Sequence, residues 1–339
     1  MKILAIETSC DETSVAVLEN DEVLVNLISS QEIHKKFGGV VPELSSRAHL
    51  QIVLPLVKSA LKKSHIKKEE IDLVAATAGP GLIGALLVGL TFGKSFAYSI
   101  NKPFFPVNHI EGHIFSGFLM DEKPEYPFLC LVVSGGHTLL LNVESPVRIF
   151  QLGSTIDDAA GEAFDKVSKL IGLGYPGGPN IEKQSKLGKD FIDFPIAKLN
   201  SKYDFSYSGL KTAVLRYYQD FTSHPENYKE VSINDIASSF QKAAVNALIE
   251  KLLLAISEKD FNSISVVGGV AANSLLQSKL KEIGDKKKIK IVIPALEYCG
   301  DNAAMIGLRA YQLFSEGLVY DYETNAFPSL HNNTFITKQ

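Results

Sequence analysis

Short apolar runs separated by polar turns open the chain. Residues 2–6, 14–18 and 23–29 are apolar runs of strand length, so each predicts a β-strand. Residues 7–13 would then form a hairpin tip rich in hydroxyl and carboxyl groups. Such a tip can hold a phosphate or a hydrated cation, with Ser9 and Glu12 as candidate contacts, although an ordinary polar turn has the same composition.

The rest of the chain alternates between longer amphipathic stretches and short buried runs. Helices are predicted at residues 45–65, 85–98 and 233–257, and strands at 73–77, 128–133, 139–143, 263–267 and 290–293. Residues 106–115 are interpreted as helical, and residues 155–166 as a helix start with Asp157 and Asp158 in its first turn. The tail from Glu323 onward is polar, and we expect it to be loosely held.

Glycine-rich turns follow several of the predicted strands. The turn Ser134-Gly135-Gly136-His137 can bring a phosphate against bare backbone, with Ser134 and His137 as donors, although a plain hairpin turn fits it too. The turn after residue 267 ends in Asn273, whose amide can bond a ribose or a purine. Asp165 can bond a ribose hydroxyl, unless it belongs to a solvated, charge-paired helix face.

Two histidines form the most specific chemical pattern. His109 and His113 are four residues apart and share one face of the predicted helix. Two imidazoles on one face make half of a metal site, which needs a further ligand; a helix cap and a core histidine are the alternative. Asp301 is either that ligand or the N-cap of the helix that follows it. Glu111 stands two residues after His109, so the metalloprotease pattern His-Glu-x-x-His is not matched here.

Composition and charge narrow the classes of function. The 339 residues are enough for two domains, and 45% of them are hydrophobic. A net charge of −4 disfavours a stand-alone nucleic-acid binder, so RNA binding needs a local basic surface or a partner protein. Lys35, Lys36, Lys211 and Arg216 are candidate RNA contacts, although solvated surface loops commonly carry such residues.

Cysteine usage and hydropathy indicate the compartment. The three cysteines are too few and too scattered for a disulfide framework, which fits a reducing cytoplasm. Residues 1–7 predict a strand rather than a signal peptide. The apolar run 82–90 is interrupted by Gly84 and Gly89, and no run approaches the ~18 residues needed to span a membrane. We therefore expect a cytoplasmic protein without a membrane partner.

Seven motifs, in order along the chain, carry a resemblance to one family. They are Glu7-Thr-Ser-Cys-Asp-Glu-Thr13, Asn108-His-Ile-Glu-Gly-His113, Val132-Val-Ser-Gly-Gly-His-Thr138, Gly161-Glu-Ala-Phe-Asp165-Lys166, Tyr175-Pro-Gly-Gly-Pro179, Gly268-Gly-Val-Ala-Ala-Asn273 and Asp301-Asn-Ala-Ala-Met305. From Met1 to about Gly317 the chain resembles the bacterial TsaD family of tRNA threonylcarbamoyladenosine synthases, formerly called glycoproteases. The resemblance implies an α/β, two-lobed, actin-like ATPase fold (acetate kinase, Hsp70, actin), with duplicated mixed sheets flanked by helices.

The resemblance also implies a division of the chain. Residues 1–120 would form the N-terminal lobe with the metal-binding helix, and residues 121–298 the C-terminal lobe. The proline-punctuated linker 121–127 marks that boundary. Residues 299–339 would supply a C-terminal helix that returns to the metal site and the N-terminal lobe, followed by the polar tail.

Site residues follow from the family by matching position. His109, His113 and Asp301 would bind one divalent metal ion per subunit, iron(II) or else zinc. The residues that would bind the adenylate substrate are Val132, Val133, Ser134, Gly135, Gly136, Asp165, Gly178, Glu182 and Asn273. The chain departs from the family pattern at Gly300, where Thr or Ser is expected, and at Glu182, where Asp is expected.

The reaction that the resemblance implies is the transfer of a threonylcarbamoyl group. The donor would be threonylcarbamoyl-adenylate, the acceptor N6 of the adenosine next to the anticodon in tRNAs that read ANN codons, and AMP would be released. No residue of the sequence stands out as a general base. The implied partners are a TsaB-like paralogue and a TsaE-like ATPase, which would help to hold the tRNA.

Three other functions are weighed against this one. A sugar or acetate kinase-like phosphotransferase would use the same fold, but it has no need of the pair His109 and His113. A non-catalytic scaffold would have lost the metal triad, which is present. A metallo-endopeptidase, a label that the family has carried, is disfavoured by the position of Glu111.

Overall fold

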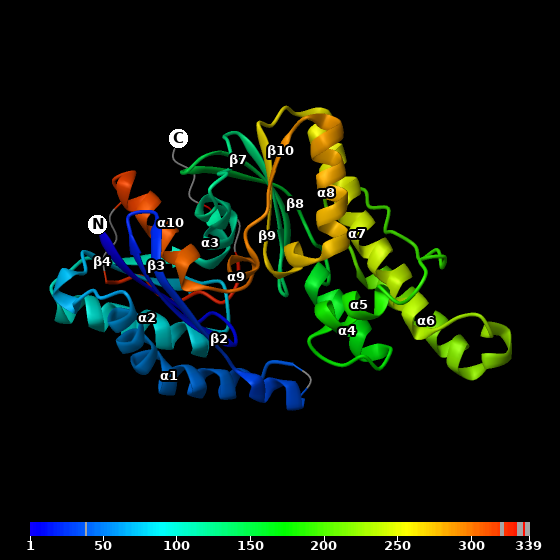
Figure 1. Cartoon of the computed structure of the whole chain (residues 1–339), viewed down its shortest axis with the longest axis horizontal. Coiled ribbons are helices and arrows are strands. Elements are labelled where there is room, and N and C mark those ends of the chain that lie inside the picture. The colour runs from blue at the N-terminus through cyan, green and yellow to red at the C-terminus, as the bar shows by residue number, and fades with distance from the viewer. Residues whose placement is uncertain (38, 319–321, 331–334, 336–339) are drawn as a thin grey trace. The chain divides into compact units, whose positions relative to one another are not determined.

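The structure, a computed structural model, describes residues 1–37, 39–318, 322–330 and 335 (Figure 1). Their internal contacts divide the chain into two units. Unit 1 comprises residues 1–123, residues 144–149 and the described residues from Pro294 onward, and unit 2 comprises residues 124–143 and 150–293. The expected lobes, by comparison, changed between residues 120 and 121 and between residues 298 and 299. The unit boundaries lie a few residues from these positions, and residues 144–149 belong with unit 1.

Unit 1 is built on a five-stranded sheet. Its strands are β1 (Lys2–Glu7), β2 (Glu12–Glu19), β3 (Glu22–Ser30), β4 (Leu73–Gly79) and β5 (Phe104–Asn108), in the order β3-β2-β1-β4-β5. β1 pairs antiparallel with β2 and parallel with β4. The strands predicted in this part of the chain are confirmed, and the segment between β1 and β2 is a hairpin connection.

Helices cover both faces of this sheet. The helices of unit 1 are α1 (Pro42–Lys63), α2 (Ile83–Ser99), α3 (His109–Phe115), α9 (Leu296–Cys299) and α10 (Ala303–Ser315), with the 3-10 turns η1 (Glu32–Phe37), η2 (Lys68–Glu70) and η3 (Ser116–Leu119). Successive side chains of β1 point to opposite faces. Leu4 and Ile6 belong to a core with α1 and α2, whereas Ile3 and Ala5 belong to a core with α10. Unit 1 is therefore a three-layer sandwich, with α1 and α2 together on one side (Figure 1).

Helix α10 lies close against the sheet because Gly307 has no side chain. A Cβ atom at this position would overlap Leu18 and lie 3.1 Å from the Cβ of Ala5. Leu18 and Ala5 are both fully buried, so neither has room to move aside. The glycine thus sets the distance between α10 and strands β1 and β2.

Unit 2 repeats the strand pattern of unit 1. Its strands are β6 (Phe128–Val133), β7 (Thr138–Ser145), β8 (Arg148–Ser154), β9 (Ser263–Val267) and β10 (Lys290–Val292), in the order β10-β9-β6-β7-β8. β6 pairs antiparallel with β7 and parallel with β9, as β1 does with β2 and β4. The predicted duplication of mixed sheets is therefore confirmed.

Helices and short 3-10 turns connect the strands of unit 2. They are α4 (Ala160–Leu170), α5 (Gly177–Ser185), α6 (Ser208–Ser223), α7 (Ile233–Glu258) and α8 (Ser274–Lys287), with the 3-10 turns η4 (Pro225–Tyr228) and η5 (Gly269–Ala272). Helix α7 is the long helix predicted at residues 233–257. Strand β8 and helix α6 were not predicted from the sequence.

Two sequence interpretations are wrong. Residues 106–108 belong to β5 and not to a helix, because β5 pairs with β4 at the edge of the sheet, where Pro106 is tolerated. Asp157 and Asp158 precede α4, which begins at Ala160. They are held outside the helix because Asp157 Oδ1 accepts a bond from the backbone N–H of Tyr207 (2.8 Å) and the Asp158 carbonyl accepts one from Thr155 (2.6 Å).

Within the part of the chain that the structure describes, no helix has both the length and the apolar composition that crossing a bilayer requires.

Two glycine-to-alanine substitutions test the close packing of α10. Gly307→Ala should lower the free energy of unfolding by about 1–3 kcal/mol, because the added methyl group overpacks the core against Leu18 and Ala5. Gly209→Ala in α6 meets nothing within 4 Å and should raise it by up to about 1 kcal/mol through helix propensity. Urea unfolding measures both. Equal effects would contradict the close approach.

Candidate functional site

Helix α3 carries the two histidines and starts directly after β5. The side chain of Asn108 caps it, since Asn108 Oδ1 accepts bonds from the backbone N–H groups of Ile110 (2.9 Å) and Glu111 (3.3 Å). The cap fixes the first helical residue as His109 and places His113 one turn later on the same face. The two rings meet edge to face, with their centroids 4.7 Å apart.

Asp301 comes to these histidines from a distant part of unit 1. The N-cap of α10 is Asn302, whose Oδ1 accepts a bond from the backbone N–H of Met305 (3.0 Å). Asp301 is therefore not the cap, and its carboxylate faces the imidazoles instead. Its Oδ1 lies 3.0 Å from His113 Nε2 and 3.5 Å from His109 Nε2.

This donor set suits a divalent metal ion. One ligand atom each from His109, His113 and Asp301 lie within 4.8 Å of one another. Donor atoms at the usual ~2.0–2.2 Å from one ion are roughly 3–4 Å apart, so a small closure brings all three onto it. Both histidines are buried, whereas the Asp301 side chain is 22% exposed. The group can therefore hold a metal ion and leave a side open to a substrate.

Glu7 completes the surroundings of His109, and sequence reasoning missed this role. The fully buried carboxylate at the end of β1 lies 3.1 Å from His109 Nδ1. It also accepts hydrogen bonds from the backbone N–H of Ser9 and from the hydroxyl of Thr77. A carboxylate behind a ligating imidazole fixes the tautomer that points Nε2 at the metal. The signal available in the sequence was a carboxylate placed directly after the apolar run of residues 3–6.

The electrostatics of the group favour a bound cation. Burial lowers the pKa of His109, but the carboxylates of Asp301 and Glu7 outweigh it and raise the pKa to about 10. Burial raises the pKa of Asp301, yet the two histidines hold it well below its ordinary value. Two carboxylates facing two imidazoles thus stabilise positive charge between them, whether a proton or a metal ion supplies it.

Glu111 points away from the histidines and forms a buried ion pair. Its Oε2 lies 2.8 Å from Arg309 Nε and 2.5 Å from Arg309 Nη2, and both side chains are fully buried. The guanidinium of Arg309 also stacks on the ring of Phe115 at 3.9 Å. Glu111 is therefore a structural link between α3 and α10, and it is not placed to act as the base of a metallo-endopeptidase.

The hairpin between β1 and β2 contributes Ser9 and Glu12. The hydroxyl of Ser9 lies 3.5 Å from Asp301 Oδ2, a long hydrogen bond. Burial, together with the neighbouring carboxylates of Asp301 and Asp11, raises the pKa of Glu12 to about 9. A protonated Glu12 donates a hydrogen bond at neutral pH, as a phosphate contact requires.

In unit 2, the turn after β6 exposes bare backbone. Val132 and Val133 are fully buried in the strand, so their side chains serve the core. The turn is closed by bonds from Ser134 N–H to the His137 carbonyl (2.9 Å) and from His137 N–H to Ser134 Oγ (3.1 Å). Nothing lies within 4 Å of a Cβ built at either glycine between them, so a ligand can approach the main chain there.

Glycines pack two further segments against this turn. A Cβ at Gly161, in α4, would lie 2.5 Å from the Ser134 carbonyl, and one at Gly268 would lie 2.5 Å from the Val133 carbonyl. The first contact packs helix α4, which carries Asp165, against the turn. The second packs the segment that ends at Asn273 against it. Helix α4 and the segment 268–273 therefore pack against the same turn.

Helix α5 joins the same group. Asp165 Oδ1 accepts a bond from the backbone N–H of Gly177 (2.6 Å), which opens α5, and the space around Gly178 is open. Burial raises the pKa of Glu182, but hydrogen bonds from Ser274 and Lys186 outweigh it and hold the pKa below its ordinary value. Ser274 directly follows Asn273, so α5 and the start of α8 lie together.

Asn273 already has partners within the protein. Its Oδ1 caps α8 through the backbone N–H of Leu276 (3.1 Å), and its Nδ2 donates to Gln241 Oε1 (2.8 Å). Gln241 donates in turn to Ser185 in α5 (2.9 Å). This buried network fixes the orientation of the Asn273 amide.

The candidate RNA contacts differ in what they offer. Lys35 and Lys36 belong to η1, and their side chains lie outside the described part of the chain. The Lys211 ammonium is 2.5 Å from Asp158 Oδ2, so its charge is already paired. Arg216 is exposed on α6.

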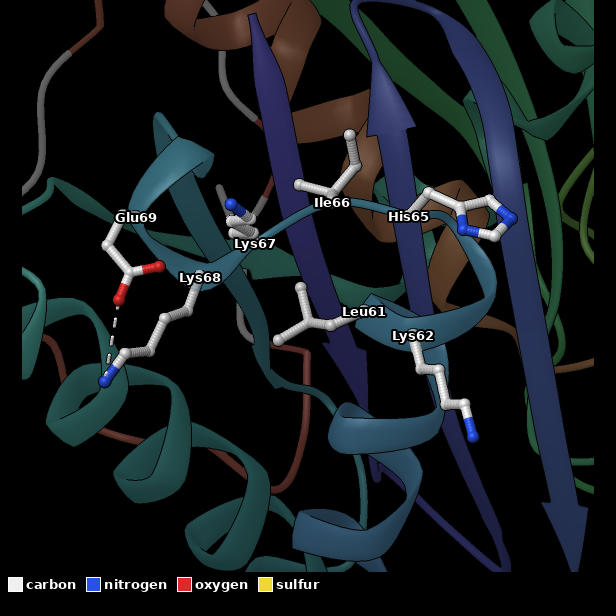
Figure 2. Close-up of a pocket in the computed structure, with 7 residues that line it drawn as sticks. All are labelled: Leu61, Lys62, His65, Ile66, Lys67, Lys68 and Glu69. Atoms are coloured by element: carbon white, nitrogen blue, oxygen red, sulfur yellow. Dashed lines mark ion pairs between the residues drawn. The ribbon is translucent and has the colours of Figure 1, made fainter.

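A shallow pocket of about 500 Å³ lies at the end of α1, and none of the residues that line it belongs to the candidate site (Figure 2). It is lined by Leu61, Lys62, His65, Ile66, Lys67, Lys68 and Glu69. Figure 2 shows Lys62 and Lys68 pointing away from one another, and Lys68 lies 3.9 Å from Glu69. These two ammonium groups therefore do not converge on one ligand.

Comparisons with known proteins agree on one description. A family model described as tRNA N6-adenosine threonylcarbamoyltransferase matches residues 22–308. Proteins of that name from Thermosipho africanus and Dictyoglomus turgidum are 49% and 48% identical to this chain over 333 residues. Those alignments cover 97% of this chain and 99% and 98% of the two relatives.

Solved structures show the fold. HypF from T. kodakarensis has a TM-score of 0.61 at 16% identity over 93% of this chain, which spans 48% of HypF. The activator of 2-hydroxyisocaproyl-CoA dehydratase from Clostridium difficile, with bound ADPNP, has a TM-score of 0.51 at 13% identity, covering 95% of this chain and 99% of the activator. The predicted actin-like ATPase fold is confirmed.

The buried ion pair between α3 and α10 can be tested by removing one partner. Glu111→Ala should lower the free energy of unfolding by about 3–5 kcal/mol, because it leaves the Arg309 charge buried and unpaired. The matched control is Glu43→Ala, which breaks the exposed pair with Arg47 and should cost less than about 0.5 kcal/mol. Urea unfolding measures both, and a small effect at Glu111 would contradict the buried link.

Asp158 should make stability depend on pH. Burial raises its pKa, but bonds from Lys166 and Lys211 outweigh burial and hold the pKa below its ordinary value. A depressed carboxyl pKa stabilises the fold above the unfolded value, near 3.9, and this stabilisation is lost as the pH falls through the folded value.

Unfolding by urea at several pH values checks this sign. Asp158→Asn should be less stable than the wild type by about 1 kcal/mol at pH 7, a figure that allows for solvent screening of the lysines. The difference should shrink below about pH 4. The exposed control Asp260→Asn should change stability by less than about 0.5 kcal/mol. A gap for Asp158→Asn that stays constant with pH would contradict the assignment.

Proposed function

Because the chain belongs to the tRNA N6-adenosine threonylcarbamoyltransferase family, we propose that it transfers the threonylcarbamoyl group of threonylcarbamoyl-adenylate to tRNA. The acceptor is N6 of the adenosine next to the anticodon in tRNAs that read ANN codons, and AMP is the second product. The observation that carries the proposal is the 49% identity over 97% of the chain to a protein of that activity.

The metal part of the proposal rests on the donor set in unit 1. His109, His113 and Asp301 hold one divalent ion per subunit, iron(II) or else zinc, and Glu7 orients His109. When bound, the ion supplies a Lewis acid that orients an oxygen of the transferred group and stabilises negative charge on it. The exposed edge of Asp301 leaves room for that oxygen.

The adenylate part rests on the turn in unit 2. The open backbone of Gly135 and Gly136 suits the phosphate of the adenylate, and the Ser134 and His137 side chains flank it. Asp165, Gly178, Glu182 and Asn273 line the rest of the substrate site, with Val132 and Val133 as its buried support. In unit 1, Ser9 and Glu12 are candidate hydrogen-bond donors to a phosphate or a nucleotide.

Positioning carries much of the rate in this proposal. The exocyclic amine of adenine is a poor nucleophile, and none of the described side chains is assigned as its general base. What the chain's residues do is bind the donor, orient its reacting carbon and hold adenosine N6 against it. The tRNA backbone is contacted by Lys35, Lys36 and Arg216. Lys211 joins them once its ammonium group leaves Asp158.

Partners and compartment belong to the same proposal. A TsaB-like paralogue and a TsaE-like ATPase help to hold the tRNA, in line with the net charge of −4. The packed helices α1 and α2 expose apolar side chains at Leu50, Leu54, Ile83 and Leu87, a surface for the paralogue. The chain works in the cytoplasm with its tRNA, where its three free cysteines stay reduced.

Nucleoside mass spectrometry of bulk tRNA tests the function. Depleting the protein in its own host should remove most of the N6-threonylcarbamoyladenosine, and the wild type should restore it. His109→Ala should restore less than about a tenth, because the metal loses one of three ligands.

The matched control is His224→Ala, which removes an exposed histidine bonded to Asp220 and should restore the nucleoside fully. Soluble protein and thermal unfolding of each variant are measured in parallel. A nucleoside level that does not respond to depletion would refute the transferase, and full rescue by His109→Ala would refute the metal role.

A further inference from the structure

Residues 322–330 pack within unit 1, which corrects the expectation of a loose tail for residues 323–330. Residues 331–334 and 336–339 of that predicted tail lie outside the described part of the chain. The ring of Tyr322 stacks on Phe104 with 6.2 Å between centroids, and its hydroxyl donates to the Lys102 carbonyl (2.8 Å). Five residues later, Phe327 packs on the core beneath α1 and α2. This segment lies outside the residues 22–308 that the family model matches.

Phe327 and Pro328 hold the turn that follows β4. The backbone N–H of Phe327 donates to the Ala78 carbonyl (2.9 Å), and the backbone N–H of Gly81 donates to the Pro328 carbonyl (3.2 Å). Gly79 has a φ of 152°, and a Cβ there would overlap both the carbonyl and the ring of Phe327. The turn and the C-terminal segment are therefore fitted to one another.

The same turn contacts the hairpin beside the metal residues. The backbone N–H of Leu82 donates to the Ser9 carbonyl (2.8 Å), and a Cβ at Gly81 would lie 2.5 Å from that oxygen. Ser9 in turn donates its backbone N–H to Glu7, and Glu7 lies 3.1 Å from His109 Nδ1. A continuous set of contacts thus runs from Phe327 to the imidazole of His109.

We propose that Phe327 is a positioning residue of the metal centre. Its bulk and its main-chain bond keep the turn 79–82 against Ser9, which holds the Glu7 carboxylate in the orientation that fixes His109. Without the aromatic ring the turn can move away from the sheet, and Glu7 then gains rotamers that no longer support the ligand. The inference rests on the proposed metal site and adds a residue distant in sequence from its ligands.

Zinc affinity of the purified full-length chain, measured by competition with a chromophoric chelator, is the readout. Phe327→Ala should weaken Zn²⁺ binding by about 10-fold, the usual effect of disturbing the support of a ligating histidine. Phe327→Leu keeps most of the bulk and should restore affinity to within about twofold. If Phe327→Ala does not fold, Phe327→Val is the milder truncation.

The matched control is Tyr322→Ala, which loosens the same segment at its other end. A purely structural role would make both alanine variants alike in thermal unfolding and in zinc affinity. Positioning predicts that Tyr322→Ala lowers thermal stability but changes zinc affinity by less than twofold. Tyr322 contacts Tyr98, Phe104 and Lys102, whereas Phe327 contacts the turn itself.

A double-mutant cycle tests the route through Glu7. Glu7→Gln alone should weaken zinc binding, and adding Phe327→Ala should weaken it by no more than a further twofold, because the support is already lost. Multiplicative effects, or an unchanged affinity in Phe327→Ala, would overturn this inference alone. A wild type that binds no zinc or iron would overturn the metal assignment of the proposed function as well.

Discussion

The ion pair between Glu111 and Arg309 is the interaction on which the metal residues depend. It joins two helices whose paired residues are 198 positions apart, inside a core that excludes water. Neither charge is stable there alone, so α3 and α10 are held in one arrangement. That arrangement brings Asp301, just before α10, to the face of α3 that carries the histidines.

The sheet enforces the same arrangement from the other side. Gly307 lets α10 approach β1 and β2 closely, and the Asn302 cap starts the helix at a defined residue. The end of β1 supplies Glu7, which supports His109 from behind. The candidate metal ligands, the carboxylate that supports His109 and the glycine that sets the helix spacing are thus all held by packed helices and strands. Sites built on such rigid elements are the most precise.

In unit 2, glycines allow the elements around the β6 turn to pack closely, whereas in unit 1 a buried ion pair holds α3 and α10 together. Gly161 and Gly268 let α4 and the turn before α8 pack against backbone carbonyls of the β6 turn. The buried network of Ser185, Gln241 and Asn273 then ties α5, α7 and α8 together. Close backbone contacts of this kind leave the exposed face of Gly135 and Gly136 free for a ligand.

Much of the fold could be predicted because strands and helices have different hydrophobic periods. Apart from β5 and β8, the strands of both sheets were predicted in this way, as were the long helices α1, α2 and α7, and the spacing of His109 and His113 indicated a metal-binding face. The run at Pro106 misled, because proline begins helices and also tolerates an edge strand. The local sequence pattern does not distinguish a helix start from an edge strand at this position, because the strand is determined by its pairing with β4.

Other parts of the site needed tertiary structure. Asp301 and Asn302 are both residue types that cap helices well. Asn302 caps α10 because the Asp301 side chain is turned toward the histidines of α3. The role of Glu7 depends on an imidazole 102 positions away. The pairing of Lys211 with Asp158 and the contacts of Phe327 are likewise long-range, and no local sequence signal specifies them.

Anomalous X-ray diffraction from crystals of the metal-loaded protein, at the absorption edge of iron or zinc, tests the central claim most directly. The account predicts one strong peak about 2.0–2.3 Å from His109 Nε2, His113 Nε2 and an oxygen of Asp301. A peak elsewhere, with these three side chains unliganded in fully loaded protein, would contradict it.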